Sequence, residues 1–170
     1  MIVRPATAED AVKLSEVLQA LVAAGTRRSP ADPGFVLGHY IAAPAGIRCS
    51  VAIDTDGQHT DGQATDRQDA DGRILGFQSL KRAEAGNPYD TPIGWGIIGT
   101  HVRPDAARRG VGRALFASTL DAAQAAGLPA IEAYISATNA GAIAYYGSLG
   151  FETYRPVDGV DCRRLLVTPL

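Results

Sequence analysis

A short basic segment at residues 108–113, Arg-Arg-Gly-Val-Gly-Arg, has the composition of a phosphate-binding loop. Its glycines let a ligand approach the backbone, and its arginines supply positive charge. The segment leads directly into a helical pattern, because apolar residues recur on one face with a period of about 3.6 residues: Val111, Leu115, Phe116, Thr119, Leu120 and Ala123. The first amides of a helix are unpaired and carry about half a positive charge. We therefore expect this segment to bind a pyrophosphate.

Three further features follow along the chain at defined spacing. Asn139 precedes a helical pattern that it can cap, Tyr146 comes next, and Gly150-Phe151 closes the stretch. Together with the segment Ala-Arg-Arg-Gly-Val-Gly at residues 107–112, this order resembles the GNAT superfamily of acyl-CoA-dependent N-acyltransferases. The signature of that family is Gln/Arg-x-x-Gly-x-Gly/Ala, then an Asn, then a Tyr shortly before Gly-Phe. Residues 100–104 also resemble the strand end that precedes the loop in that family. Ala107 departs from the signature, so one side-chain contact is lost while the backbone contacts remain.

The resemblance implies an enzyme that moves an acetyl group from acetyl-CoA to a primary amine of a small molecule, such as an amino acid or an analogue. It implies a bulged strand end near His101 and Val102 that splays the sheet, with free backbone groups that pair with the pantetheine arm and polarise the thioester carbonyl. The residues expected to bind the cofactor are Val102, Arg103, Arg108, Arg109, Gly110, Val111, Gly112, Arg113 and Asn139.

Acyl transfer to an amine also needs two proton transfers. Tyr146 matches the family tyrosine, and a phenol with a pKa of about 10 can protonate a thiolate whose conjugate acid has a pKa of about 8.5. His101 is our candidate for the base that deprotonates the amine, with Glu84 and Glu132 as carboxylate alternatives. Neither cysteine lies in the motif stretch, so we expect direct attack without an acyl-enzyme.

Two other functions compete with this interpretation. The same fold could serve as a non-catalytic acyl-CoA-binding sensor, in which Tyr146 would be dispensable. Residues 94–99 also spell G-x-G-x-x-G, the dinucleotide fingerprint, but that motif must follow a strand and open a helix. Here Pro88 and Pro92 precede it, and the extended residues 100–104 follow it, so we predict a strand instead.

The composition indicates one globular domain over residues 1–170. The chain has 46% apolar residues and a formal net charge of −2, which favours neither nucleic acid nor a membrane as partner. Two cysteines and no apolar leader favour a cytoplasmic location. The sequence leaves open whether the chain forms a homodimer.

The periodicities predict strands at residues 1–4, 47–53, 73–81, 97–102, 130–136, 151–155 and 162–167, with a turn at residues 156–159 before the last strand. Helices are expected at residues 11–22, after a capping box at residues 7–10, and at residues 35–43, 111–126 and 140–149. The order βααβββαβαββ predicts an α/β fold of the GNAT type, with a mixed, mostly antiparallel twisted sheet flanked by helices. Residues 54–72 are rich in Asp and Gly and predict a mobile loop. Their spacing lacks the ligand order of a calcium-binding EF-hand, so we expect no metal, and His59 in this loop is expected in solvent.

Overall fold

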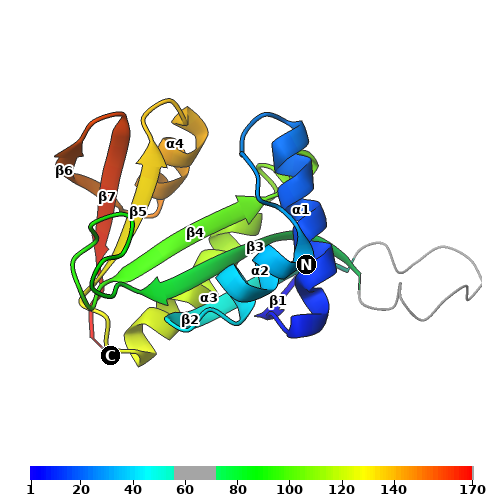
Figure 1. The fold of residues 1–170 in the computed structure, drawn as a ribbon, viewed down its shortest axis with the longest axis horizontal. Helices are drawn as coiled ribbons and strands as arrows, with labels where there is room; N and C mark the ends of the chain where they lie inside the picture. Colours follow the sequence, from blue (N-terminus) through cyan, green and yellow to red (C-terminus); the bar gives the residue numbers. More distant parts are fainter. Residues whose placement is uncertain (56–71, 170) are drawn as a thin grey trace, which may run out of the picture.

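The computed structural model describes residues 1–55 and 72–169, and a seven-stranded sheet forms its centre (Figure 1). The strand order is β1-β2-β3-β4-β5-β7-β6, and every neighbouring pair is antiparallel except β4 and β5. The predicted mixed, mostly antiparallel sheet is confirmed. The strands are β1 (Ile2–Pro5), β2 (Gly46–Asp54), β3 (Arg73–Arg82), β4 (Gly96–Val102), β5 (Ala130–Ser136), β6 (Glu152–Val157) and β7 (Val160–Leu166).

The helices follow the predicted order along the chain. They are α1 (Ala11–Ala23), α2 (Pro33–Val36) with a π-helical turn η2 (Leu37–Ile41), α3 (Val111–Ala125) and α4 (Ala140–Ser148); η1 (Ala8–Asp10) and η5 (Pro104–Ala106) are 3-10 turns. The capping box before α1 is present, because the Thr7 amide donates to Asp10 Oδ2 at 2.8 Å. Gly127 ends α3 with a φ of 64°, a left-handed conformation that favours glycine. No helix of the described residues is long and apolar enough to cross a membrane.

The alternation of side chains along β3 divides the core between the two faces of the sheet. Phe77 packs with Leu14, Leu18 and Val36, in the cluster formed with α1 and α2. Leu80 packs in the cluster formed with α3 and α4, which contains Ile98, Phe116, Ile131, Ala133, Tyr146 and Phe151. The sheet is therefore covered by helices on both faces, as Figure 1 shows.

Strands β4 and β5 pair only at their beginnings and then diverge (Figure 1). Their register consists of Gly96 opposite Ile131 and Ile97 opposite Glu132. The register of β4 with β3 continues without interruption from Gly96 to Val102. The bulge expected near His101 and Val102 is therefore absent on this side of β4, and the sheet opens because two parallel strands separate.

The opening leaves backbone groups of β4 without a strand partner. The Arg103 amide donates to the Leu75 carbonyl at 2.9 Å, so this residue faces β3. Since successive residues of a strand direct their amides to opposite sides, the amides of Thr100 and Val102 face the gap left by β5. This placement agrees with a binding role for the Val102 backbone.

The structure bears on the local predictions for residues 94–99 and 156–159. Residues 96–99 form the first part of β4, and a 3-10 turn rather than a helix follows, so the dinucleotide interpretation of residues 94–99 is excluded. Strand β6 continues to Val157 and includes Pro156, so the predicted turn at residues 156–159 is shorter than expected; β6 is an edge strand, where proline is tolerated. The expected mobile loop, with His59 and the rejected calcium site, falls mainly on residues 56–71, which lie outside the described residues.

Candidate active site

A cavity of about 880 Å³ lies where the separated strands meet α3 and α4. We call it the site cavity. It is lined by α1 and the loop after it, by the end of β4, by the loop into α3 with the first turn of that helix, and by α4. Its lining includes Thr26, Arg27, Thr100, His101, Val102, Arg108, Gly110, Val111, Gly112, Arg113, Asn139, Tyr145 and Tyr146. The structure thus brings most of the predicted site residues to one cavity.

The loop into α3 is held in a conformation that exposes the helix N-terminus. Gly110 is the N-cap of α3 with a φ of 78°, and Arg108 has a φ of 63°. A Cβ added to Gly110 would meet nothing within 4 Å, so glycine is required there by its dihedral angle rather than by crowding. The first amides of α3 can therefore face an anionic ligand in the site cavity.

Two predicted cofactor contacts lie elsewhere. Arg109 forms an ion pair with Asp54, with 3.0 Å between Nη2 and Oδ2, and is not part of the cavity lining. Arg103 also lies outside the lining, with its Nε 3.6 Å from Asp105 Oδ1. Both arginines contribute positive charge near the loop, while Arg108 and Arg113 line the cavity itself.

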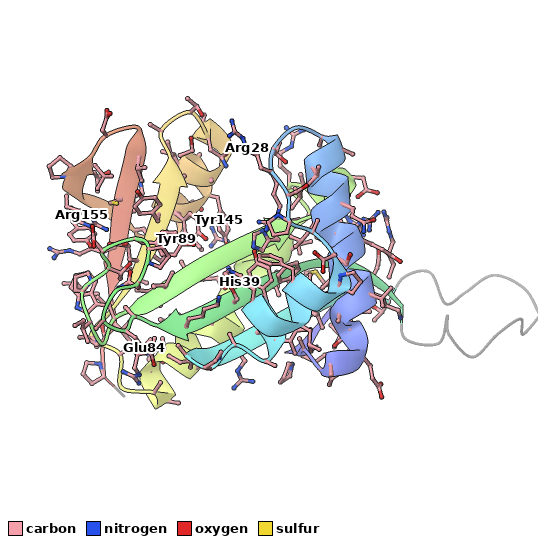
Figure 2. The ribbon with its side chains drawn as sticks, viewed as in Figure 1. Arg28, His39, Glu84, Tyr89, Tyr145 and Arg155 are labelled. Carbon is pink, nitrogen blue, oxygen red and sulfur yellow. The ribbon has the colours of Figure 1, made fainter. Side chains whose placement is uncertain are left out.

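A glycine is needed at position 112 because of a packing contact that the sequence did not reveal. A Cβ at this position would lie 2.7 Å from Cε2 of Tyr145. The ring of Tyr145 therefore occupies the space beside Gly112, and its hydroxyl donates to the Gly112 carbonyl oxygen at 2.8 Å. Figure 2 shows Tyr145 between β4 and β5, at the opening of the sheet. The sequence signal was slight: two adjacent tyrosines, of which we selected only Tyr146.

A chain of hydrogen bonds connects Tyr145 with Tyr146. Gln78 Nε2 lies 3.2 Å from Tyr145 Oη and 2.7 Å from Thr100 Oγ1, and Thr100 Oγ1 lies 2.8 Å from Tyr146 Oη. The only proton of Tyr145 is used at the Gly112 carbonyl, so Tyr145 Oη accepts from Gln78. The second N–H of Gln78 then donates to Thr100. The hydroxyls of Thr100 and Tyr146 share the last hydrogen bond, which places the Tyr146 hydroxyl at the end of this series of contacts.

Tyr146 is largely shielded from solvent. Its side chain is 5% exposed, and its ring contacts Tyr145 and Phe151, with centroids at 4.8 and 5.1 Å. Burial raises the pKa of Tyr146 well above its ordinary value, which the hydrogen bond with Thr100 partly opposes. The phenol is therefore protonated at neutral pH, as a proton donor must be.

Asn139 has the predicted capping role. Its Oδ1 accepts from the Ala142 amide at 3.0 Å and fixes the start of α4. Because Asn139 also lines the site cavity, its side-chain amide hydrogens can face a ligand while its oxygen caps the helix.

His101 lies among aromatic rings on the face that carries α1 and α2. Its ring centroid is 4.7 Å from that of Phe77 and 5.2 Å from that of Tyr40. Burial lowers the pKa of His101 to about 3, and the charge of Arg27 acts in the same direction. Its imidazole is therefore uncharged at neutral pH.

The two carboxylate alternatives differ from each other in their surroundings. Glu84 is exposed. Glu132 is fully buried, where it accepts hydrogen bonds from Thr91, Tyr154 and Arg155 and forms an ion pair with Arg155 at 3.0 Å. These contacts join β5, β6 and the segment before β4. Within this network, Glu132 has the surroundings of a structural anion.

Residues 53–151 match the Acetyltransferase (GNAT) family. The chain belongs to this family. The resemblance inferred from residues 107–112, Asn139, Tyr146 and residues 150–151 is thereby confirmed. The mycothiol acetyltransferase of Clavibacter michiganensis subsp. michiganensis is 42% identical over 84 residues, which are 49% of this chain and 25% of that protein. The chain thus spans about a quarter of the length of the mycothiol acetyltransferases it matches.

Solved GNAT structures share the fold of the whole chain. A GCN5-related N-acetyltransferase from Kribbella flavida superposes with a TM-score of 0.69 at 23% identity, covering 97% of this chain and 96% of that one. The yncA structure from Salmonella typhimurium, which contains its cofactor acetyl-CoA, has a TM-score of 0.66 at 18% identity and covers 98% and 94% of the two chains. At these identities the likeness concerns the fold, and it confirms the predicted fold class of this GNAT protein.

Proposed function

We propose that this GNAT protein transfers an acetyl group from acetyl-CoA to a primary amine of a small molecule by direct attack. The observation that carries the proposal is that one cavity is lined by the first residues of α3, by the diverging end of β4 and by Tyr146. Family membership supports the same reaction, and the acetyl-CoA bound in yncA supports the choice of donor.

The donor is held by residues of the loop and of the strand. The diphosphate binds at the first amides of α3, beside Arg108 and Arg113, because the helix dipole and the arginines favour an anion there. The pantetheine arm enters the gap between β4 and β5, where the free groups of β4 and the side chain of Asn139 replace the missing strand contacts. Arg103 and Arg109 act at longer range through their charge.

The chemical step needs polarisation of the carbonyl and a proton for the leaving group. The Val102 amide faces the gap and donates to the thioester oxygen, where negative charge develops. The amine nitrogen forms a bond with the carbonyl carbon, and the C–S bond then breaks. The thiolate takes the proton of Tyr146, whose hydroxyl is held in place by its hydrogen bond with Thr100.

The amine must lose a proton before or during attack. His101 is next to Val102 and is uncharged at neutral pH, so it can accept a hydrogen bond from the amine. With a pKa of about 3 the imidazole is too weakly basic to take up that proton, which leaves to solvent instead. His101 therefore orients the amine and is not its base.

A screen of small amines with acetyl-CoA, read by release of the CoA thiol, tests this proposal. We expect transfer to at least one amine, and Tyr146→Phe should lower kcat about 100-fold while acetyl-CoA binding persists. Gly110→Glu should abolish that binding by placing a strained, negatively charged residue at the helix N-terminus. Binding of acetyl-CoA without transfer to any amine would favour the sensor function instead.

A further inference from the structure

Arg27 and Lys81 have no acidic partner among residues 1–55 and 72–169. Arg27, in the loop after α1, lines the cavity, and its Nε is buried without a hydrogen-bond partner. Its Nη2 donates to the Pro30 carbonyl at 3.2 Å, and the guanidinium also forms a hydrogen bond with the Tyr40 side chain. Lys81 lies near the end of β3, with its Nζ 5.5 Å from the ring centroid of Tyr40. Neither forms an ion pair in the described part of the chain.

The two cations act on the same pair of aromatic side chains. Burial lowers the pKa of His39, and the charges of Lys81 and Arg27 lower it further. Burial raises the pKa of Tyr40, and Arg27 opposes that change through its charge and a hydrogen bond. In Figure 2, His39 lies beside α2, on the face of the sheet covered by α1 and α2. The positive ends of Arg27 and Lys81 therefore converge around His39 and Tyr40.

This positive region adjoins the place where acyl transfer would occur. The ring of Tyr40 is 5.2 Å from that of His101, and His101 precedes Val102, whose amide faces the opening of the sheet. Arg27 and Lys81 are each half-buried, whereas the buried carboxylates Asp10 and Glu132 are paired with Arg4 and Arg155. A partly desolvated cation without a counter-charge is unfavourable, so such a cation is expected where a ligand supplies the negative charge.

We propose that Arg27 and Lys81 form a subsite for a carboxylate of the acceptor, so that the acceptor is a small amino carboxylate. The inference rests on the proposed acetyl transfer and assigns its substrate class. The guanidinium of Arg27 can bind a carboxylate with two parallel hydrogen bonds, whereas the Lys81 ammonium acts as a point charge. With the carboxylate held beside Tyr40, the amine of the same molecule can reach His101 and the end of β4.

A comparison of amino acids with their carboxamides tests the subsite, because each amide keeps the amine and side chain of its acid and lacks only the negative charge. For the best acceptor, the acid should exceed its amide by about 10- to 100-fold in kcat/KM, as expected for hydrogen bonds to a charged group. Arg27→Gln and Lys81→Met should each reduce this preference, chiefly by raising KM for the acid more than KM for the amide.

Arg28→Gln is the matched control. Arg28 is the next residue of the same loop and is exposed. Its substitution by Gln removes the same positive charge as Arg27→Gln does. The acid-to-amide preference should persist in this variant. Equal loss in Arg27→Gln and Arg28→Gln would show a general effect of net charge and overturn the subsite.

A binding measurement separates failure of the subsite from failure of the proposed reaction. Calorimetric titration of the CoA-saturated protein with the amino acid and its amide requires no turnover. Tighter binding of the acid, lost in Arg27→Gln, would support the subsite even if no amine were acetylated. Equal affinity for acid and amide, or an Arg27→Gln variant that loses affinity for CoA itself and keeps its preference for the acid, would overturn it.

Discussion

The Tyr145 hydroxyl donates to the Gly112 carbonyl at 2.8 Å, and this contact begins a series of hydrogen bonds that reaches Tyr146. Since a carbonyl can only accept, Tyr145 has no proton left for Gln78 and accepts from it. The amide nitrogen of Gln78 also donates to Thr100, whose hydroxyl shares a hydrogen bond with Tyr146. The first turn of α3 is thus connected to the proposed general acid through three side chains.

Replacement of Thr100 tests this connection. Thr100→Val keeps the shape of the side chain and removes the hydroxyl, so Tyr146 loses the hydrogen-bond partner that orients it. We expect kcat to fall about 10-fold with little change in KM for acetyl-CoA. Thr100→Ser, which restores the hydroxyl, should recover most of the activity. Steady-state kinetics of the two variants decides the matter, and normal kcat in Thr100→Val would disprove the orienting role.

The position of Gly112 predicts a steric effect that can be reversed. In Gly112→Ala the new Cβ would lie 2.7 Å from Tyr145 Cε2, so the ring must move. We expect a loss of about 1–3 kcal/mol in the free energy of unfolding and weaker acetyl-CoA binding. Combining it with Tyr145→Ala should remove most of the additional loss, because the double variant has no ring to displace. If the losses in free energy of unfolding caused by Gly112→Ala and Tyr145→Ala simply add in the double variant, the ring of Tyr145 is not what requires glycine at position 112.

The environment of His101 predicts a dependence of stability on pH. Its pKa is about 3 in the folded chain and about 6.5 when unfolded, so the unfolded state binds the extra proton first on acidification. The contribution of uncharged His101 to the free energy of unfolding is fully present above about pH 6.5 and is lost between about pH 6.5 and 3. Between pH 7 and 5 the loss should be up to about 2 kcal/mol, and it should be absent in His101→Gln.

The same residue predicts the pH profile of activity. Because the imidazole is not protonated above about pH 3, wild-type kcat/KM should show no acid limb from His101 near pH 6.5. His101→Ala should lower kcat/KM without changing the shape of the profile. An acid limb near pH 6.5 that disappears in His101→Ala would instead show an ordinary base in contact with solvent.

The Glu132 network predicts a loss of stability rather than of chemistry. Glu132→Gln leaves Arg155 without its counter-charge, and we expect a loss of about 3 kcal/mol in the free energy of unfolding. Asp105→Asn, which removes an exposed partner of Arg73, should change stability little. The folded fraction of Glu132→Gln should keep its kcat. Loss of kcat without loss of stability would make Glu132 the catalytic base.

The sequence by itself determined the features that arise within one segment. Hydrophobic periodicity predicted the helices and strands and their order, because each pattern reports which face of a local element is buried. The cap at Asn139 and the end of α3 at Gly127 depend on backbone chemistry over a few residues, and they too were accessible.

Only the tertiary structure decided which side chains meet. Gln78, Thr100 and Tyr145 come from β3, β4 and α4, and no spacing in the sequence encodes their contacts. The reason for a glycine at position 112 is a ring that is 33 residues away in the chain. Arg27 and Lys81 likewise look like ordinary surface cations until the fold places both around Tyr40. Local patterns specify elements through backbone energetics, whereas a site depends on distances between elements, which are fixed only when the core has packed.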